Sequence, residues 1–380
     1  MRNTCHQTLY KQAETLFAEG AYAEARAIFL VLDRYNNSYQ EVERCDVFLA
    51  DPEAAAVYRR ARTLWEEEKY GEAMALYESI IDFHDSKDQL DAVVKAAEKE
   101  ATRLGNEGDY AAARDILKSL GYDRSNQLYK QYDQAADGQY AEAVASGLQQ
   151  LILPEGITEI PAEWFQGSAL ISLRCPKSLR SIADFAFEGC KTLREVELQE
   201  GLLTIGQAAF RRCDAMRAIT LPKTLTAIGA DAFSGCSVLR EIVIPTMVRE
   251  IPASAFFGCA GLESLTLHDG VETIGDSAFS GCTSLVELRL PAYLQSIGAN
   301  AFFACTKLRT LEIPAFVSLI GKNAFSSCNV LGKVTFAEPN GWKLVGKEGT
   351  LDLSAPKSNA SKLHSSEYGD YAWVREVIVA

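Results

Sequence analysis

The chain has 380 residues, 48% of them hydrophobic, and carries a formal net charge of −13. That length predicts two or three structural units, and its apolar runs are too short for a membrane-spanning helix. Most of the negative charge lies in residues 1–150, which hold 17 Lys and Arg against 27 Asp and Glu. This balance disfavours nucleic acid as a partner, because nucleic-acid-binding surfaces gather Lys and Arg.

The first 17 residues, MRNTCHQTLYKQAETLF, lack the apolar core of a secretory signal peptide. Read as written, the sequence predicts a cytoplasmic protein. A cell-surface location stays open if a leader peptide precedes these residues.

A Tyr-x-x-Ala element recurs through residues 1–150, beginning at Tyr22, Tyr70, Tyr110 and Tyr140. The apolar residues around it recur with a period near 3.6, which predicts helices. We expect the Tyr to fill the angle between two antiparallel helices that meet at the small residue. Polar turns at 36–38, 84–86 and 123–125 are expected to cap a further helix, which would lengthen the first two units.

This pattern resembles the tetratricopeptide repeat, although its tyrosines are 48, 40 and 30 residues apart and that family repeats every 34 residues or so. The resemblance implies an α-solenoid over residues 1–150. It also implies that this half binds peptide segments or helices of other proteins.

Residues 151–338 repeat with a period of 23 from the second copy onward. The columns that keep this period are Phe165, Phe187, Phe210, Phe233, Phe256, Phe279, Phe302 and Phe325, and Ile160, Ile182, Ile205, Ile228, Ile251, Ile274, Ile297 and Ile320. Each repeat pairs an extended segment, such as 239–245, with a compact segment, such as 253–258, long enough for about one helical turn. One such repeat cannot bury its own apolar face, so the repeats are expected to stack into a solenoid of about eight coils.

The repeat L-x-x-I-x-I-P-x-x-L-x-x-I-G-x-x-A-F-x-G-C-x-x-L is similar to the BspA-type leucine-rich repeat of bacterial surface proteins. The resemblance implies a leucine-rich-repeat β-solenoid with short helical turns over 151–338. It also implies adhesion, or binding to a host or matrix protein, at a bacterial surface.

A cysteine recurs in the same position, as Cys190, Cys213, Cys236, Cys259, Cys282, Cys305 and Cys328. Metal ligand, disulfide half, nucleophile and packing residue are the possible roles. Each Cys follows the core Phe by three residues, and the seven members neither pair nor adopt metal-site spacing. We therefore predict a column of buried, reduced thiols.

The Gly before each compact segment, as in Gly206 and Gly229, is replaced by Pro161 and Pro252 in two repeats. Because Pro fixes φ near −65°, this position cannot require a positive φ. Close backbone packing is the predicted reason for Gly here. Residues 339–380, which contain Trp342 and Trp373, are expected to cover the open end of the solenoid.

No combination of residues points to catalysis. The four histidines are far apart in the sequence, and the common nucleotide-binding, serine-hydrolase and zinc-protease motifs do not occur. We therefore predict a non-enzymatic protein that needs no cofactor and no metal.

Without a catalytic site, the function is expected to depend on surfaces that bind a partner. The candidate partner-binding residues are Glu241, Glu287 and Arg289 on the strand face, Phe257 and Phe303 beside the core phenylalanines, and Met247, Tyr293 and Phe316 in the turn after the strand. Exposed aromatic residues anchor interfaces, but these could instead pack on the helical half or the C-terminal segment. The partner is expected to be a protein, and its identity and the oligomeric state stay open. An adhesin is the first hypothesis and an intracellular scaffold the second.

Overall fold

The computed structural model describes residues 2–33 and 35–375. The chain divides into two compact units, Met1–Gly138 and Gln139–Ala380. Each unit is described by itself.

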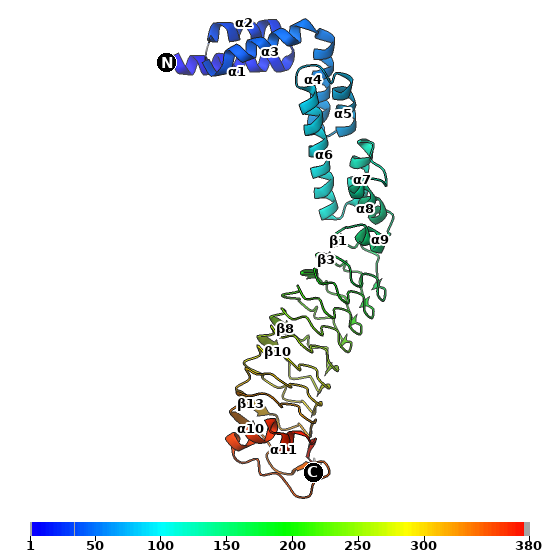
Figure 1. The fold of residues 1–380 in the computed structure, drawn as a ribbon, viewed down its shortest axis with the longest axis vertical. Helices are drawn as coiled ribbons and strands as arrows, with labels where there is room; N and C mark the ends of the chain where they lie inside the picture. The colour runs from blue at the N-terminus through cyan, green and yellow to red at the C-terminus, as the bar shows by residue number, and fades with distance from the viewer. Residues whose placement is uncertain (1, 34, 376–380) are drawn as a thin grey trace. The chain divides into compact units, whose positions relative to one another are not determined.

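The first unit is helical, as predicted (Figure 1). Its helices are α1 (Arg2–Glu19), α2 (Tyr22–Leu32), α3 (Ser38–Ala50), α4 (Pro52–Glu66), α5 (Tyr70–Ser79), α6 (Ser86–Glu107), α7 (Tyr110–Ser119) and α8 (Gln127–Ala136), with a short 3₁₀ helix at Tyr35–Asn37. The pairs α1–α2, α4–α5 and α6–α7 pack together. Tyr22, Tyr70 and Tyr110 begin the second helix of each pair, and the Ala three residues later is fully buried.

The unequal spacing of these tyrosines has two causes. An extra helix, α3, lies between the first two hairpins, as expected. The second spacing is long for a different reason: α6 itself has 22 residues, whereas α8 has 10. The expectation that an added helix lengthens both units is therefore wrong for the second.

The fourth Tyr-x-x-Ala element, which begins at Tyr140, belongs to the second unit. Helix α9 (Tyr140–Ala145) lies beyond the division after Gly138, which comes before the boundary expected at residue 150. The ring of Tyr140 contacts that of Trp164 in the first coil, with 6.1 Å between centroids. Tyr140, Ala143 and Leu148 are all buried.

The solenoid that follows has two ladders of parallel strands. The longer strands are β1 (Gln150–Ile152), β3 (Ser172–Arg174), β5 (Glu195–Glu197), β8 (Glu241–Val243), β10 (Ser264–Thr266), β13 (Thr310–Ile313) and β15 (Lys333–Phe336). The two-residue strands are β2 (Glu159–Ile160), β4 (Ser181–Ile182), β6 (Thr204–Ile205), β7 (Ala227–Ile228), β9 (Glu250–Ile251), β11 (Thr273–Ile274), β12 (Ser296–Ile297) and β14 (Leu319–Ile320). Pairing follows the repeat: Ile242 lies opposite Leu265, for example, and Ile274 opposite Ile297. Figure 1 shows the coils stacked one upon the next.

The compact segments are tight turns rather than the helical turns expected. Each contains two residues with positive φ, such as Asp231 (58°) and Gly235 (77°), and left-handed residues end a right-handed helix. Alternate amide groups donate to the next coil, and those between them donate to the carbonyl three residues earlier. The N–H of Phe187, for example, donates to the carbonyl of Ala209 at 2.8 Å. These turns thus form a third line of contacts between coils.

The core runs along the solenoid in columns. The rings of Phe187, Phe210 and Phe233 stack with centroids 5.2 and 5.5 Å apart and planes within 6° of parallel. The Phe, Ile and Cys columns are buried throughout. The expected reason for the Gly column is confirmed: a Cβ added to Gly229 would lie 2.4 Å from the backbone of Gln207 and of Gly206.

The C-terminal segment continues one of the ladders. Strand β17 (Trp373–Arg375) pairs antiparallel with β14, and β16 (Trp342–Leu344) pairs with β17. Helix α10 (Pro356–His364) packs on β15 and is followed by α11 (Ser366–Gly369). Trp342 and Trp373 are both 1% exposed. Residues 376–380, also expected in this segment, lie outside the described residues.

Candidate partner-binding surfaces

The cysteines of the column have a structural role, because their thiols link successive coils by hydrogen bonds. All seven thiols are buried and free, and each Sγ donates to the carbonyl of a core Phe in the preceding coil, at 3.0–3.4 Å. Burial raises the pKa of Cys236 to about 12. Because the thiolate is the reactive form, such thiols are poor nucleophiles at neutral pH. Among the described residues, no group of three or more His, Cys, Asp or Glu is placed to hold a metal ion.

Phe257 and Phe303 lie on the turn side of the solenoid, as predicted. They directly follow the fully buried Phe256 and Phe302, yet they are 47% and 37% exposed. The equivalent residues in the neighbouring coils are buried serines, such as Ser280. Phe257 and Phe303 thus stand two coils apart with only a small side chain in the coil between them.

A second exposed group lies at the corner between the two strand ladders. Met247, Tyr293 and Phe316 are 58%, 59% and 59% exposed. Tyr293 and Phe316 occupy adjacent coils, and their rings are in contact, with 5.6 Å between centroids. Met247 is separated from them by the coil of Gly270. The structure therefore joins two of these three candidates into one aromatic pair.

Two grooves open on the face of the longer strands, and neither was foreseen from the sequence. The ladder is interrupted there, because residues 218–220 and 287–289 form no strand and the sheet divides into β1-β3-β5, β8-β10 and β13-β15. One groove, of about 420 Å³, lies beside the first gap and is lined by Ile219, Glu241 and Val243, among others. The larger, of about 720 Å³, lies beside the second gap.

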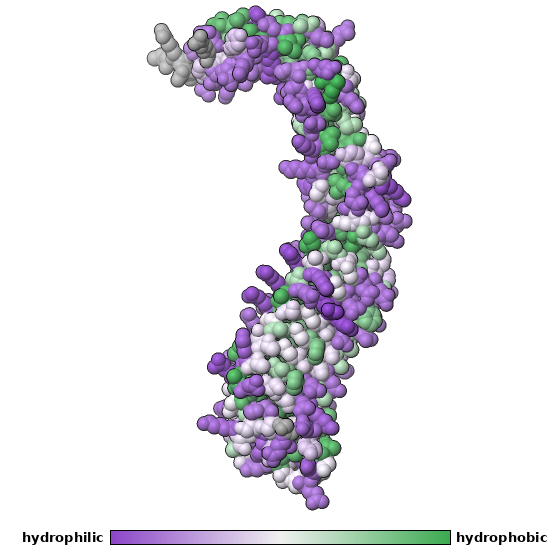
Figure 2. Space-filling view, viewed as in Figure 1, coloured by the Kyte–Doolittle hydropathy of each residue, from purple (hydrophilic) through white to green (hydrophobic). Residues whose placement is uncertain are grey.

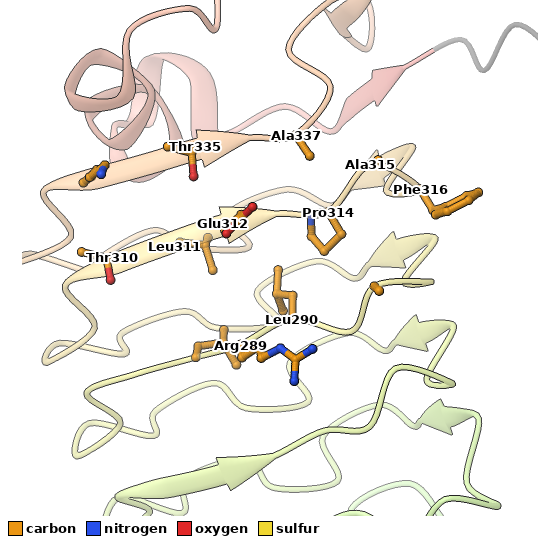
Figure 3. Close-up of a pocket in the computed structure, with 13 residues that line it drawn as sticks. Arg289, Leu290, Thr310, Leu311, Glu312, Pro314, Ala315, Phe316, Thr335 and Ala337 are labelled. Carbon is orange, nitrogen blue, oxygen red and sulfur yellow. The ribbon is translucent and has the colours of Figure 1, made fainter.

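The larger groove has an apolar floor and a mixed rim. Leu288, Leu290 and Leu311 form part of its floor. Figure 3 shows Arg289 and Glu312 on successive coils and Phe316 projecting from the turn at one end. Phe316 brings the aromatic pair to the edge of this groove. In the view of Figure 2, the solenoid surface mixes hydrophilic side chains with smaller hydrophobic areas.

The three charged candidate residues differ in their position relative to the two grooves. Arg289 lines the larger groove and lies 3.3 Å from Asp269 in an exposed ion pair. Glu241 lines the smaller groove. Glu287 is exposed but is not among the residues that line either groove.

The helical unit has a cleft that sequence reasoning also missed. The turn at 84–86 was expected to cap a helix, but Asp85 makes no side-chain cap on α6. Its carboxylate instead accepts hydrogen bonds from the Tyr58 hydroxyl at 2.8 Å and from Gln89 Nε2 at 2.9 Å. Burial opposes ionisation of Asp85, but these hydrogen bonds hold its pKa below the usual value. Burial also lowers the pKa of His84, against the attraction of Asp85. These residues line one wall of a cleft of about 560 Å³.

The repeat pattern matches a known family. The profile of the BspA type leucine-rich repeat region matches residues 139–263 and 249–346, in six copies. The chain belongs to the BspA type leucine-rich repeat family. Its solenoid has the fold expected of that family, which is a family of protein-binding repeats.

Several solved structures resemble this BspA type protein. A leucine-rich repeat protein of Treponema pallidum is 33% identical, with a TM-score of 0.39, over 48% of this chain and 77% of that one. A leucine-rich repeat protein of Bacteroides ovatus is 27% identical, with a TM-score of 0.40, over 49% and 60% of the two chains. A leucine-rich cell surface protein of Faecalibacterium prausnitzii is 27% identical, with a TM-score of 0.38, over 50% and 48%.

Comparison with curated proteins gives no match. Within the described part of the chain, no helix combines the length and apolar character needed to cross a bilayer.

Proposed function

We propose that the protein is a non-enzymatic binding protein whose protein partner docks on the larger groove. The observation that carries the proposal is the contact between Tyr293 and Phe316 at the groove edge, where two large aromatic side chains are 59% exposed. Aromatic residues beside an apolar pocket are the usual anchors of protein interfaces. The Leu floor supplies apolar area, and Arg289 and Glu312 supply a polar rim.

The biological role that we propose is adhesion, or binding to a host or matrix protein, at a bacterial surface. Membership of the BspA type family supports this role. Treating intact cells of the bacterium that produces the protein with protease tests the location. A surface protein is degraded, while a cytoplasmic marker survives. Survival of the protein together with that marker would contradict the surface role.

A pull-down from the native surroundings tests the binding site. Tyr293→Thr with Phe316→Thr gives both coils the residue that Thr224 provides in the same column. The matched control is Phe257→Ser with Phe303→Ser, which removes two exposed aromatic residues on the turn side. We expect the first variant to lose the partner and the second to retain it. Equal recovery by both variants would contradict the groove as the site.

The second candidate function is an intracellular scaffold that binds a partner through the helical unit. The Tyr-headed hairpins α1–α2, α4–α5 and α6–α7 support a tetratricopeptide-like unit, and the cleft beside Asp85 is the observation that favours binding there. The protease experiment separates this function from the first.

A further inference from the structure

The cleft beside Asp85 in the helical unit adjoins a second hollow. The second hollow, of about 140 Å³, shares Arg44, Tyr58, Arg62 and Glu66 with the cleft of about 560 Å³, so the two adjoin. Together they extend from α1 and α3, across α4, to the start of α6. We call the combined hollow the arginine cleft.

Three arginines converge on the arginine cleft, in the half of the chain where acidic residues predominate. Arg62 Nε lies 3.2 Å from Glu66, and Arg44 Nη1 lies 3.2 Å from Glu41. The third, Arg59, forms no ion pair with a carboxylate among the described residues. Its Nη1 donates instead to the backbone carbonyl of Glu19 at 3.0 Å. Arg59 is thus the arginine of the cleft without a carboxylate partner, and it lines the smaller hollow, whereas Asp85, held by the neutral donors Tyr58 and Gln89, lines the larger one.

The position of Arg59 is built into the fold. Gly20 follows the last residue of α1, and a Cβ added there would lie 2.0 Å from Arg59 Nη1. The missing side chain lets the guanidinium group lie against the end of that helix. The same group also lies over the ring of Tyr22, 5.7 Å from its centroid. These contacts hold Arg59 at the cleft without neutralising it.

The arginine cleft contains hydrogen-bond donors that have no acceptor. The Nε atoms of Arg44 and Arg59 are buried and have no hydrogen-bond partner in the described part of the chain, which is costly for charged groups. The acceptors are already engaged, since Asp85 accepts from Tyr58 and Gln89, and Glu66 faces Arg62. A fitting ligand therefore brings acceptors and one negative charge. A guanidinium group binds carboxylate oxygens with two parallel hydrogen bonds.

Aromatic side chains complete the arginine cleft. Trp65 and His84 line its larger part, and Phe17 and Phe48 line its smaller part. An elongated cleft with aromatic walls and one unpaired cation fits an extended peptide in which a single acidic residue is flanked by apolar ones. We propose that the arginine cleft binds such a peptide segment of a protein partner, with Arg59 holding its carboxylate. The proposal extends the second candidate function to a defined ligand chemistry and involves no residue of the solenoid groove.

The test uses the full chain and immobilised hexapeptides of apolar residues that carry Glu, Gln or phosphoserine at one position. We expect the wild type to select the Glu peptides. Arg59→Gln should weaken their binding by about tenfold, to the level of the Gln peptides. Arg60→Gln is the matched control, because Arg60 is the next residue, exposed, and does not line the cleft. It should bind as the wild type does.

Circular dichroism checks that Arg59→Gln remains helical. If it does not, Arg59→Met takes its place, since Met keeps an unbranched apolar stem at this half-buried position and removes the charge. Failure of the wild type to prefer Glu over Gln, or the same preference in the cleft variant, would overturn the proposal. Preference for phosphoserine, or displacement of the peptides by millimolar inorganic phosphate, would show a phosphate site and would also overturn it. None of these results affects the proposal for the solenoid groove.

Discussion

The Sγ atom of Cys213 donates a hydrogen bond to the carbonyl oxygen of Phe187, 3.3 Å away in the preceding coil. The same bond links Cys236 to Phe210 and continues to the last cysteine of the column. A thiol is small and apolar enough for a packed core, yet it still supplies a weak donor. The column is therefore best explained by packing and by these hydrogen bonds, which join each coil to the one before it.

Thiol labelling of the native protein tests this explanation. Cys5 is exposed and should react at once, whereas the seven column cysteines are buried and should react only in denaturant. No reductant should be needed to reveal them. Recovery of disulfides, or labelling of the whole column in the native state, would contradict the buried-thiol assignment.

Alkaline pH should destabilise the solenoid through the same residues. Burial raises the pKa of Cys236 and of Cys282 from 9.0 to about 12. Below pH 9 the thiols are protonated in both states. As pH rises from 9 toward 12, only the unfolded thiols ionise, so the free energy of unfolding falls by up to about 1.4 kcal/mol per pH unit for each thiol.

Urea denaturation at several pH values measures this slope. The double variant Cys236→Ala, Cys282→Ala should show a shallower decline than the wild type. Identical slopes for the two proteins would show that these thiols do not have raised pKa values in the folded state.

Adjacent phenylalanines should differ sharply in their effect on stability. Phe256 is fully buried in the ring stack, so Phe256→Ala should cost about 3–5 kcal/mol. Phe257 is 47% exposed, and Phe257→Ala should stay within about half a kcal/mol. Denaturant unfolding of both variants checks the pair. Equal losses would mean that Phe257 is covered in solution.

Two glycines of the solenoid provide a similar comparison. A Cβ at Gly229 would lie 2.4 Å from backbone atoms of the preceding coil, so Gly229→Ala should destabilise the protein by about 1–3 kcal/mol. A Cβ at Gly332 would come no closer than 3.9 Å to another atom, and Gly332→Ala should change stability by about half a kcal/mol or less. A loss at Gly332 as large as that at Gly229 would contradict close packing as the reason for the Gly column.

The sequence was sufficient to predict the columns, because a strict period places equivalent residues on the same side of every coil. It therefore located Phe256, Cys236 and Gly229 correctly. It failed in the turns, where Gly235 and its equivalents were not recognised as positions that need positive φ. That signal was present, since a Gly directly precedes the Cys in most repeats.

The grooves and the arginine cleft could not have been found from the period. Residues 287–289 resemble their equivalents in the other coils, and only the stacked backbone reveals that they form no strand. Arg59 is unremarkable in the sequence of α4. Its surroundings come from Glu19, Gly20 and Tyr22, about 40 residues earlier. Such contacts depend on tertiary packing, which local pattern does not encode.

The claim that the partner docks on the larger groove is tested most directly by an affinity measurement. The partner recovered in the pull-down is purified, and its affinity for the wild type is compared with its affinity for the two double variants. Truncation of an interface anchor typically costs at least about 2 kcal/mol, or about thirtyfold in affinity. Titration calorimetry should therefore show that loss for Tyr293→Thr with Phe316→Thr. Phe257→Ser with Phe303→Ser should bind within about twofold of the wild type, because these residues lie away from the groove. Wild-type affinity in the first variant, or a thirtyfold loss confined to the second, would contradict the groove as the binding site.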